Sequence, residues 1–213
     1  HRDDPLFNEK LMRKKEFYDI MYNHEEKNVE EYSEKICNQQ TFELMPHQLF
    51  VRNFLSFQTP YNSLLLYHGL GTGKTCSAIS VSEEMRTYLQ QMGITKRLII
   101  VASPAVQENF KLQLFDERKL RKVNGLWNIK ACIGNKFIKE INPMNMKGLS
   151  RGKVIRQIKR LIRQSYLFKG YGEFANYIEE IMNKSIPSGS STEVRERIRK
   201  KNLRKEFSNR MLV

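Results

Sequence analysis

The stretch SLLLYHGLGTGKT, residues 63–75, constrains the fold of this chain more than any other part of it. An apolar run leads directly into a glycine-rich turn that ends in Lys74-Thr75. Where a strand feeds a helix, unpaired backbone N–H groups can converge on an anion, and glycines let the anion approach without a Cβ in the way. The stretch therefore predicts a buried strand at 64–67, a phosphate-binding loop, and a helix from Lys74 to about Gln91.

The loop departs from the usual pattern G-x-x-x-x-G-K-[ST] at its first letter, where His68 replaces glycine. The half of the pattern that carries the chemistry is intact, because Lys74 can place its charge against the outer phosphates and the Thr75 hydroxyl can hold Mg²⁺. Lys74 and Thr75 are thus the predicted catalytic residues. For His68 we favour helix–strand packing or a simple sequence variant over a role in catalysis. The residues expected to contact a nucleotide are Gly69, Gly71, Thr72, Gly73, Lys74 and Thr75.

A second apolar run follows at 97–102 and predicts another strand. Ser103 and Pro104 then start a helix, with serine as the cap and proline in the first helical position. Strand, loop, helix, strand and helix within a short length of chain are typical of an α/β fold built on a parallel sheet.

Two stretches beside the loop resemble motifs of superfamily 2 helicases and translocases. LMPHQ, residues 44–48, resembles the Leu-Arg-Pro-x-Gln stretch of that family, whose glutamine reads the adenine edge with an amide that both donates and accepts. LIIVASPAVQENF, residues 98–110, resembles motif Ia, whose turn and helix start touch the nucleic-acid backbone. The resemblance implies that Gln48 selects ATP. It also implies that Ser103, Pro104 and Gln107 lie near DNA or RNA.

Three segments narrow the resemblance. MPHQLFVRNFL, PYNSLLLYHGLGTGKTCSAI and YLFKGYGEFANYI look like the helicase-like ATPases of large nucleocytoplasmic DNA viruses, a group that includes the small subunit of the poxvirus early transcription factor. The resemblance implies a first RecA-like P-loop lobe in an ATP-dependent helicase or NTPase. It further implies the viral transcription machinery as a partner, and the virion and the host cytoplasm (viral factory) as locations.

The ends of the chain lead to a further expectation. The sequence starts at His1 rather than Met and stops at Val213, which predicts a part of a longer protein. In the resembling group, a segment like SNRMLV runs straight into Asp-Glu-x-His, whose carboxylates handle magnesium and the attacking water. This chain would then bind ATP but lack the hydrolytic carboxylates and the arginine finger of a second lobe, so the parent protein would be the hydrolase.

We expect a helical extension over 1–41 and an incomplete RecA-like lobe over 42–213, with a basic insertion at about 135–207. The apolar pattern predicts short helices in the extension, which would lie outside the core. Within the lobe the remaining expected elements are helices at 47–57, 153–168, 171–182 and 193–207, a strand at 128–133, a loop at 141–151 and a flexible connection at 185–192.

The charge of the chain favours a polyanionic partner. There are 37 Lys and Arg against 23 Asp and Glu, a net charge of +14, and residues 151–213 hold 16 basic but only 6 acidic residues. Cationic helices could line a nucleic-acid track or could simply be solvated faces, and we expect no membrane association. The three cysteines, Cys37, Cys76 and Cys132, have no C-x-x-C spacing, so the sequence predicts neither a disulfide framework nor a zinc site.

Two other functions remain open from the sequence. A small P-loop kinase would suit the length, with Arg195-Glu196-Arg197 imitating a lid, although no acceptor-site acid is evident. A non-catalytic nucleic-acid-binding or transcription module could use a decayed loop as scaffold, but Lys74 and Thr75 are intact.

Overall fold

The computed structural model describes residues 3–21, 28, 30–31, 34, 42–143 and 148–213. The chain divides into two compact units, one of His1–Glu84 with Gln113–Gly148 and the other of Met85–Leu112 with Leu149–Val213. Each unit is described by itself. The predicted boundary near residue 41 lies outside the described residues and stays a prediction.

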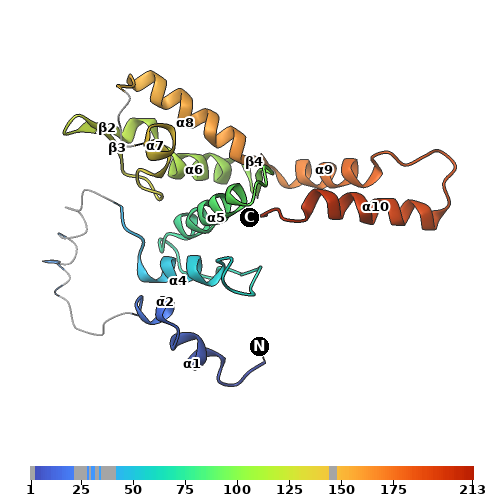
Figure 1. Cartoon of the computed structure of the whole chain (residues 1–213), viewed down its shortest axis with the longest axis horizontal. Coiled ribbons are helices and arrows are strands. Elements are labelled where there is room, and N and C mark those ends of the chain that lie inside the picture. Colours follow the sequence, from blue (N-terminus) through green and yellow to red (C-terminus); the bar gives the residue numbers. More distant parts are fainter. Residues whose placement is uncertain (1–2, 22–27, 29, 32–33, 35–41, 144–147) are drawn as a thin grey trace. The chain divides into compact units, whose positions relative to one another are not determined.

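The first unit begins with two short helices, α1 (Phe7–Met12) and α2 (Lys15–Tyr18), shown in blue in Figure 1. Short helices were predicted here, but their expected place outside the core is wrong. Phe17 is fully buried, and its ring lies 5.2 Å from that of Phe50, centroid to centroid. Burying an aromatic side chain of this size stabilises the docked position of α2.

Helix α4 (Pro46–Phe54) follows the Met45 cap, with proline in the first helical position, where it has no N–H to leave unpaired. The predicted helix ran on to residue 57. It ends earlier because the Thr59 hydroxyl donates to the carbonyl of Phe54 at 2.6 Å and closes the last turn.

The predicted buried strand at 64–67 is wrong. These residues belong to no strand, and the side chains of Leu65 and Tyr67 are 86% and 95% exposed. A buried strand needs partners for its backbone N–H and C=O groups, and neighbouring strands supply them. Among the described residues none pairs with this segment, which we call the 64–67 segment.

The predicted long helix is confirmed as α5 (Lys74–Gln91), which runs from the first unit into the second. Later in the first unit, β2 (Leu120–Val123) and β3 (Leu126–Ile129) pair antiparallel. Asn124 and Gly125 join them with φ of 50° and 79°, the left-handed geometry of a tight hairpin turn. The strand expected at 128–133 therefore exists only in its first residues, and α7 (Lys136–Ile141) follows.

A disulfide joins Cys76 at the start of α5 to Cys132 in the loop after β3. The expectation that the cysteines form no disulfide is thus wrong for this pair, whereas Cys37 lies outside the described residues. Spacing along the chain could not reveal the bond, because the two cysteines are 56 residues apart and only the fold brings their Cα atoms to 5.3 Å.

The second unit is built on a parallel sheet. The predicted strand at 97–102 is confirmed as β1 (Leu98–Val101), and it pairs in parallel with β4 (Tyr166–Lys169). On its other edge β1 bonds residues 211–213, with Ile99 N–H donating to Met211 O and Val101 N–H to Val213 O. Leu98, Ile99 and Ile100 are almost fully buried, as expected for a central parallel strand.

Helices cover this sheet. Helix α6 (Pro104–Leu114) starts where predicted, and its Phe110 packs on Tyr166 and Phe168 of β4. The predicted helix at 153–168 is observed as α8 (Arg151–Ser165), but its last residues are wrong because Tyr166–Lys169 forms β4. Pairing with β1 outweighs continuation of the helix at this point.

The unit ends in a helical hairpin, seen in orange and red in Figure 1. Helices α9 (Tyr171–Asn183) and α10 (Thr192–Phe207) confirm the two predicted helices and the connection between them. Their contact is aromatic, with Phe174 and Tyr177 of α9 against Phe207 of α10. Helices with a parallel sheet agree with the expected α/β class. None of the described helices is long and apolar enough to cross a bilayer.

Candidate functional site

The glycine-rich loop turns through the left-handed region at two of its glycines. Gly71 and Gly73 have φ of +80° and +79°, a region that other residues enter only with strain. At Gly73 an added Cβ would also lie 2.4 Å from Nε2 of Gln48, so the Gln48 side chain would have to shift and give up its hydrogen bond to Gly73 O. Both glycines are therefore favoured by conformation, and a side chain at position 73 would in addition displace Gln48.

Lys74 reaches back over the loop. Its ammonium donates to the carbonyls of His68 at 2.9 Å and Gly69 at 2.7 Å, so the charge lies within the turn that precedes α5. Thr72 tightens the same turn, since its hydroxyl donates to Gly69 O at 3.0 Å. Thr75 lies next along the chain, in the first turn of α5, where N–H groups have no partner within the helix. This is the arrangement of a cation and free N–H groups that an anion requires.

The start of α4 is docked on this loop. The Gln48 amide donates to Gly73 O at 3.3 Å and accepts from Met45 N–H at 3.0 Å, and only 4% of the residue is exposed. His47 adds a hydrogen bond between Nε2 and Thr72 O, 2.9 Å apart. The structure therefore brings two of the three predicted motifs together. Both functions of the Gln48 amide are engaged with the protein, so its reading of adenine stays a prediction.

His68, the residue that departs from the usual pattern, lies beside the same helix. Its ring meets the ring of His47 edge to face, with centroids 5.7 Å apart. Its Nδ1 is buried without a hydrogen-bond partner among the described residues. His68 therefore packs against a helix, but not between a helix and a strand, because residues 64–67 form no strand.

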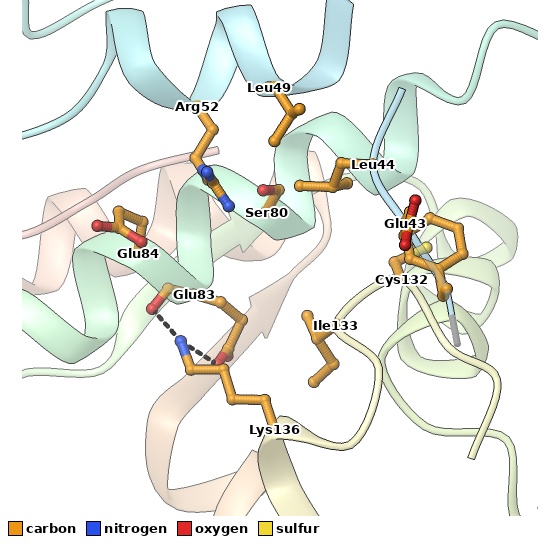
Figure 2. Close-up of a pocket in the computed structure, with 11 residues that line it drawn as sticks. Glu43, Leu44, Leu49, Arg52, Ser80, Glu83, Glu84, Cys132, Ile133 and Lys136 are labelled. Atoms are coloured by element: carbon orange, nitrogen blue, oxygen red, sulfur yellow. Dashed lines mark hydrogen bonds and ion pairs between the residues drawn. The ribbon is translucent and has the colours of Figure 1, made fainter. Parts of the chain in front are cut away.

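A cavity of about 470 Å³ lies between α4, α5 and the start of α7, all within the first unit (Figure 2). The apolar part of the cavity wall consists of the side chains of Leu44, Leu49 and Ile133. The Lys136 ammonium donates to the carbonyl of Glu83 at 2.7 Å and lies 3.3 Å from the Glu83 carboxylate, which is almost wholly buried. A buried carboxylate needs such a partner. The volume and the mixed lining are those of a small-molecule pocket.

The third motif lies in the second unit, at the carboxyl edge of the parallel sheet. Pro104 is exposed at the start of α6, beside Ser103. The Gln107 amide donates to Ala102 O at 2.8 Å, so Gln107 holds the turn that leaves β1. The structure does not place this edge relative to the glycine loop, and contacts of these residues with nucleic acid stay a prediction.

Sequence reasoning missed the neighbour of this turn. Ala102 N–H donates to Lys169 O at 3.1 Å, which brings Gly170 and Tyr171 to the same sheet edge. Tyr171 opens α9 and is 69% exposed. The segment YLFKGYGEF resembled viral ATPases, but the sequence suggested no role for it. Only the pairing of β4 with β1 shows that α6 and α9 begin side by side at this sheet edge.

Comparison with curated proteins finds relatives in large DNA viruses. "Putative helicase 009L" of Frog virus 3 (isolate Goorha) is 29% identical over 141 residues, which are 66% of this chain and 13% of that protein. "Putative ATP-dependent RNA helicase L377" of Acanthamoeba polyphaga mimivirus is 24% identical over 162 residues, 74% of this chain and 13% of that protein. "Putative ATP-dependent RNA helicase R350" of the same virus is 46% identical over 61 residues, 28% of this chain and 8% of that protein.

The chain is thus similar, over parts of its length, to viral proteins that are named as helicases. It spans 13% of the length of the first two relatives. No protein-family model matches the chain, and no solved structure matches it.

Proposed function

We propose that this chain is the ATP-binding part of an ATP-dependent helicase or translocase of a large DNA virus, and that its sheet belongs to a RecA-like lobe. The observation that carries the proposal is the docking of α4 on the glycine loop through Gln48 and His47. A fortuitous G-x-G-K-T turn has no reason to contact a Pro-x-Gln helix start that lies 25 residues away in the chain. The names of the viral relatives point the same way.

In this proposal the residues divide the work of binding. Gly71 and Gly73 let backbone N–H groups face the phosphates, and Lys74 turns its ammonium from the His68 and Gly69 carbonyls toward them. Leu44, just before α4, and Leu49, in its first turns, provide apolar surface for the purine near Gln48. ATP supplies the phosphoryl group and the energy of its transfer when it is bound.

Magnesium is proposed to bind through Thr75. Among the described residues no group of three or more His, Cys, Asp or Glu side chains is arranged to hold a metal ion. Mg²⁺ usually keeps only one or two protein ligands and takes the rest from phosphates and water, so a single hydroxyl suits it. The loop is therefore proposed to bind the metal together with the nucleotide.

The nucleic-acid contact is proposed for the carboxyl edge of the parallel sheet. Ser103 and Pro104 open α6 there, Gln107 fixes the turn, and Tyr171 adds an exposed ring at the start of α9. Helix starts favour phosphate, and an exposed aromatic ring can stack on a base. A role in viral transcription, with the virion and the host cytoplasm as locations, extends this proposal. No observation favours the kinase or the non-catalytic module over it.

The proposal is tested by titrating the 213-residue chain with Mg-ATP in a calorimeter. We expect binding, and Lys74→Ala should weaken it by roughly 2–3 kcal/mol, because the phosphates lose a charge-assisted hydrogen bond. Lys130→Ala, which removes an exposed lysine of the same unit, is the control and should change nothing. Equal affinity of the Lys74→Ala variant and the unaltered chain would refute the assignment.

A further inference from the structure

One helix of the second unit carries charge of a single sign. Helix α8 (Arg151–Ser165) holds six basic residues and no acidic residue in its 15 positions. Helix α10, which is also basic, mixes its cations with Glu193, Glu196 and Glu206. A helix whose charged residues only face solvent gains nothing from carrying charges of one sign. Opposite charges one turn apart stabilise a helix, whereas like charges at that spacing repel.

The fold decides which way these charges point. Val154, Ile158 and Ile162 are buried and anchor one face of α8 in the core of the unit. The opposite face presents four exposed cations at intervals of three and four residues, and we call it the α8 basic face: Lys153, Arg156, Arg160 and Arg163. None of these four has an ion-pair or hydrogen-bond partner within the described part of the chain.

We propose that the α8 basic face binds the phosphate backbone of nucleic acid, as a surface separate from the turn at Ser103. The row from Lys153 to Arg163 spans about 15 Å along the helix, which matches roughly four base-pair steps of a duplex. Three of its four cations are arginines, whose planar forks bind phosphate oxygens in pairs. The proposal deepens the proposed function, since it assumes that the protein works on nucleic acid.

Binding of this kind reads charge rather than base sequence. Each phosphate that is neutralised releases counterions, so the logarithm of the binding constant falls with the logarithm of salt concentration by about 0.9 per contact on a duplex and about 0.7 on a single strand. The α8 basic face therefore predicts a salt-dependent affinity that is shared by DNA and RNA, with little dependence on base sequence.

The test measures anisotropy of fluorescein-labelled DNA and RNA, duplex and single-stranded, against the whole 213-residue chain between roughly 50 and 200 mM salt. The triple variant Arg156→Gln, Arg160→Gln, Arg163→Gln should weaken binding roughly ten- to hundred-fold at about 0.1 M salt and lower the duplex salt slope by about 2–3. Replacing the same three arginines by lysine keeps the charges and should restore most of the slope. That result separates a loss of charge from a loss of folding.

The matched control removes the same net charge from another exposed helix of the same unit. Arg197→Gln, Lys200→Gln, Lys201→Gln on α10 should leave the slope within about one unit of the unaltered chain. An equal fall in both triple variants would overturn the proposal in favour of a diffuse net-charge effect. So would unchanged binding in the α8 variant, or binding to vesicles with anionic lipid that exceeds binding to nucleic acid and depends on the same arginines.

The outcome is independent of the nucleotide site. Lys74→Ala removes the cation of the loop and leaves the α8 basic face intact, so it should lose Mg-ATP and keep its nucleic-acid salt slope. A chain that binds nucleotide but shows no α8 effect refutes only this inference, whereas an α8 effect without nucleotide binding refutes only the proposed function.

Discussion

The runs LLLY at 64–67 and LIIV at 98–101 look alike in sequence, yet they have opposite fates in the structure. Leu98–Val101 is β1, bonded on both edges, with Ile99 fully buried. The 64–67 segment pairs with no described residue, and Tyr67 is 95% exposed. An apolar sequence is compatible with a strand, but a strand forms only where neighbouring strands accept and donate hydrogen bonds to its backbone N–H and C=O groups.

The two regions are held in different ways. Packing and a ladder of backbone bonds stabilise the sheet of the second unit, whereas the loop after the 64–67 segment is held by Gln48 and His47, with the Cys76–Cys132 disulfide at the start of α5. The first three changes probe this comparison, and the fourth probes the α9–α10 hairpin of the second unit.

The largest effect is expected for Ile99→Ala. Removing this side chain from the centre of the sheet should lower the free energy of unfolding by about 2–5 kcal/mol, since it leaves a cavity. Leu65→Ala, the matched truncation in the exposed segment, should change it by no more than about 0.5 kcal/mol. Urea denaturation of both variants measures the difference. A comparable loss for Leu65→Ala would show that the 64–67 segment is packed in solution.

The disulfide should come next. Cys132→Ser opens a covalent loop of 56 residues and should cost about 2–4 kcal/mol, because the unfolded chain regains freedom that the crosslink removes. Thermal unfolding with and without dithiothreitol measures it. The reductant should lower the melting temperature of the unaltered chain but not that of the variant; equal sensitivity of both would mean that this bond does not form.

The third effect separates two glycines of one loop. Gly73→Ala should cost about 2–3 kcal/mol, since it adds a clash with Gln48 to the strain of a left-handed residue, whereas Gly71→Ala meets nothing and should cost about 1–2 kcal/mol for strain alone. Chemical denaturation ranks the two. Mg-ATP affinity should also fall further in Gly73→Ala. Equal stability losses would contradict the observed contact between Gln48 and the loop.

The smallest effect concerns the α9–α10 hairpin. The Tyr177 hydroxyl donates to the Glu206 carboxylate, and this bond, aided by Arg210 and Lys96, lowers the pKa of Glu206 below its ordinary 4.5. A lowered pKa gives stability that is present above the ordinary value and is lost as pH falls through the folded value.

Tyr177→Phe should therefore cost about 1 kcal/mol at neutral pH and less in acid, because it removes the largest cause of the shift. Denaturation between neutral and acidic pH measures it, and carboxyl NMR should show the pKa of Glu206 rising. A cost that stays constant with pH would assign the effect to packing of the ring instead.

Prediction from the sequence succeeded where a single segment holds all the information. The start of α6 at Pro104 follows from local sterics, as does the connection between α9 and α10. It failed where two distant segments had to meet. Tyr166–Lys169 continued an apolar helix pattern and became β4 only because β1 was there to receive it.

The candidate site divides in the same way. The residue types at 71–75 predict a phosphate-binding loop, and the resemblance at 44–48 predicts that Gln48 recognises adenine; both functions stay predictions. The hydrogen bond from Gln48 to Gly73, the partner of Cys76 and the place of Tyr171 beside Ser103 could not be read in advance. They depend on contacts between segments far apart in the chain.

The sequence by itself determined the position of the glycine-rich turn, most helix limits and the single sign of charge along α8. The reason is that backbone sterics, capping and charge act over a few neighbouring residues. Only the tertiary structure decided which apolar run became a strand, which cysteines joined and which face of α8 turned outward. Burial and strand pairing depend on residues far away in the chain, and a local sequence pattern does not identify them.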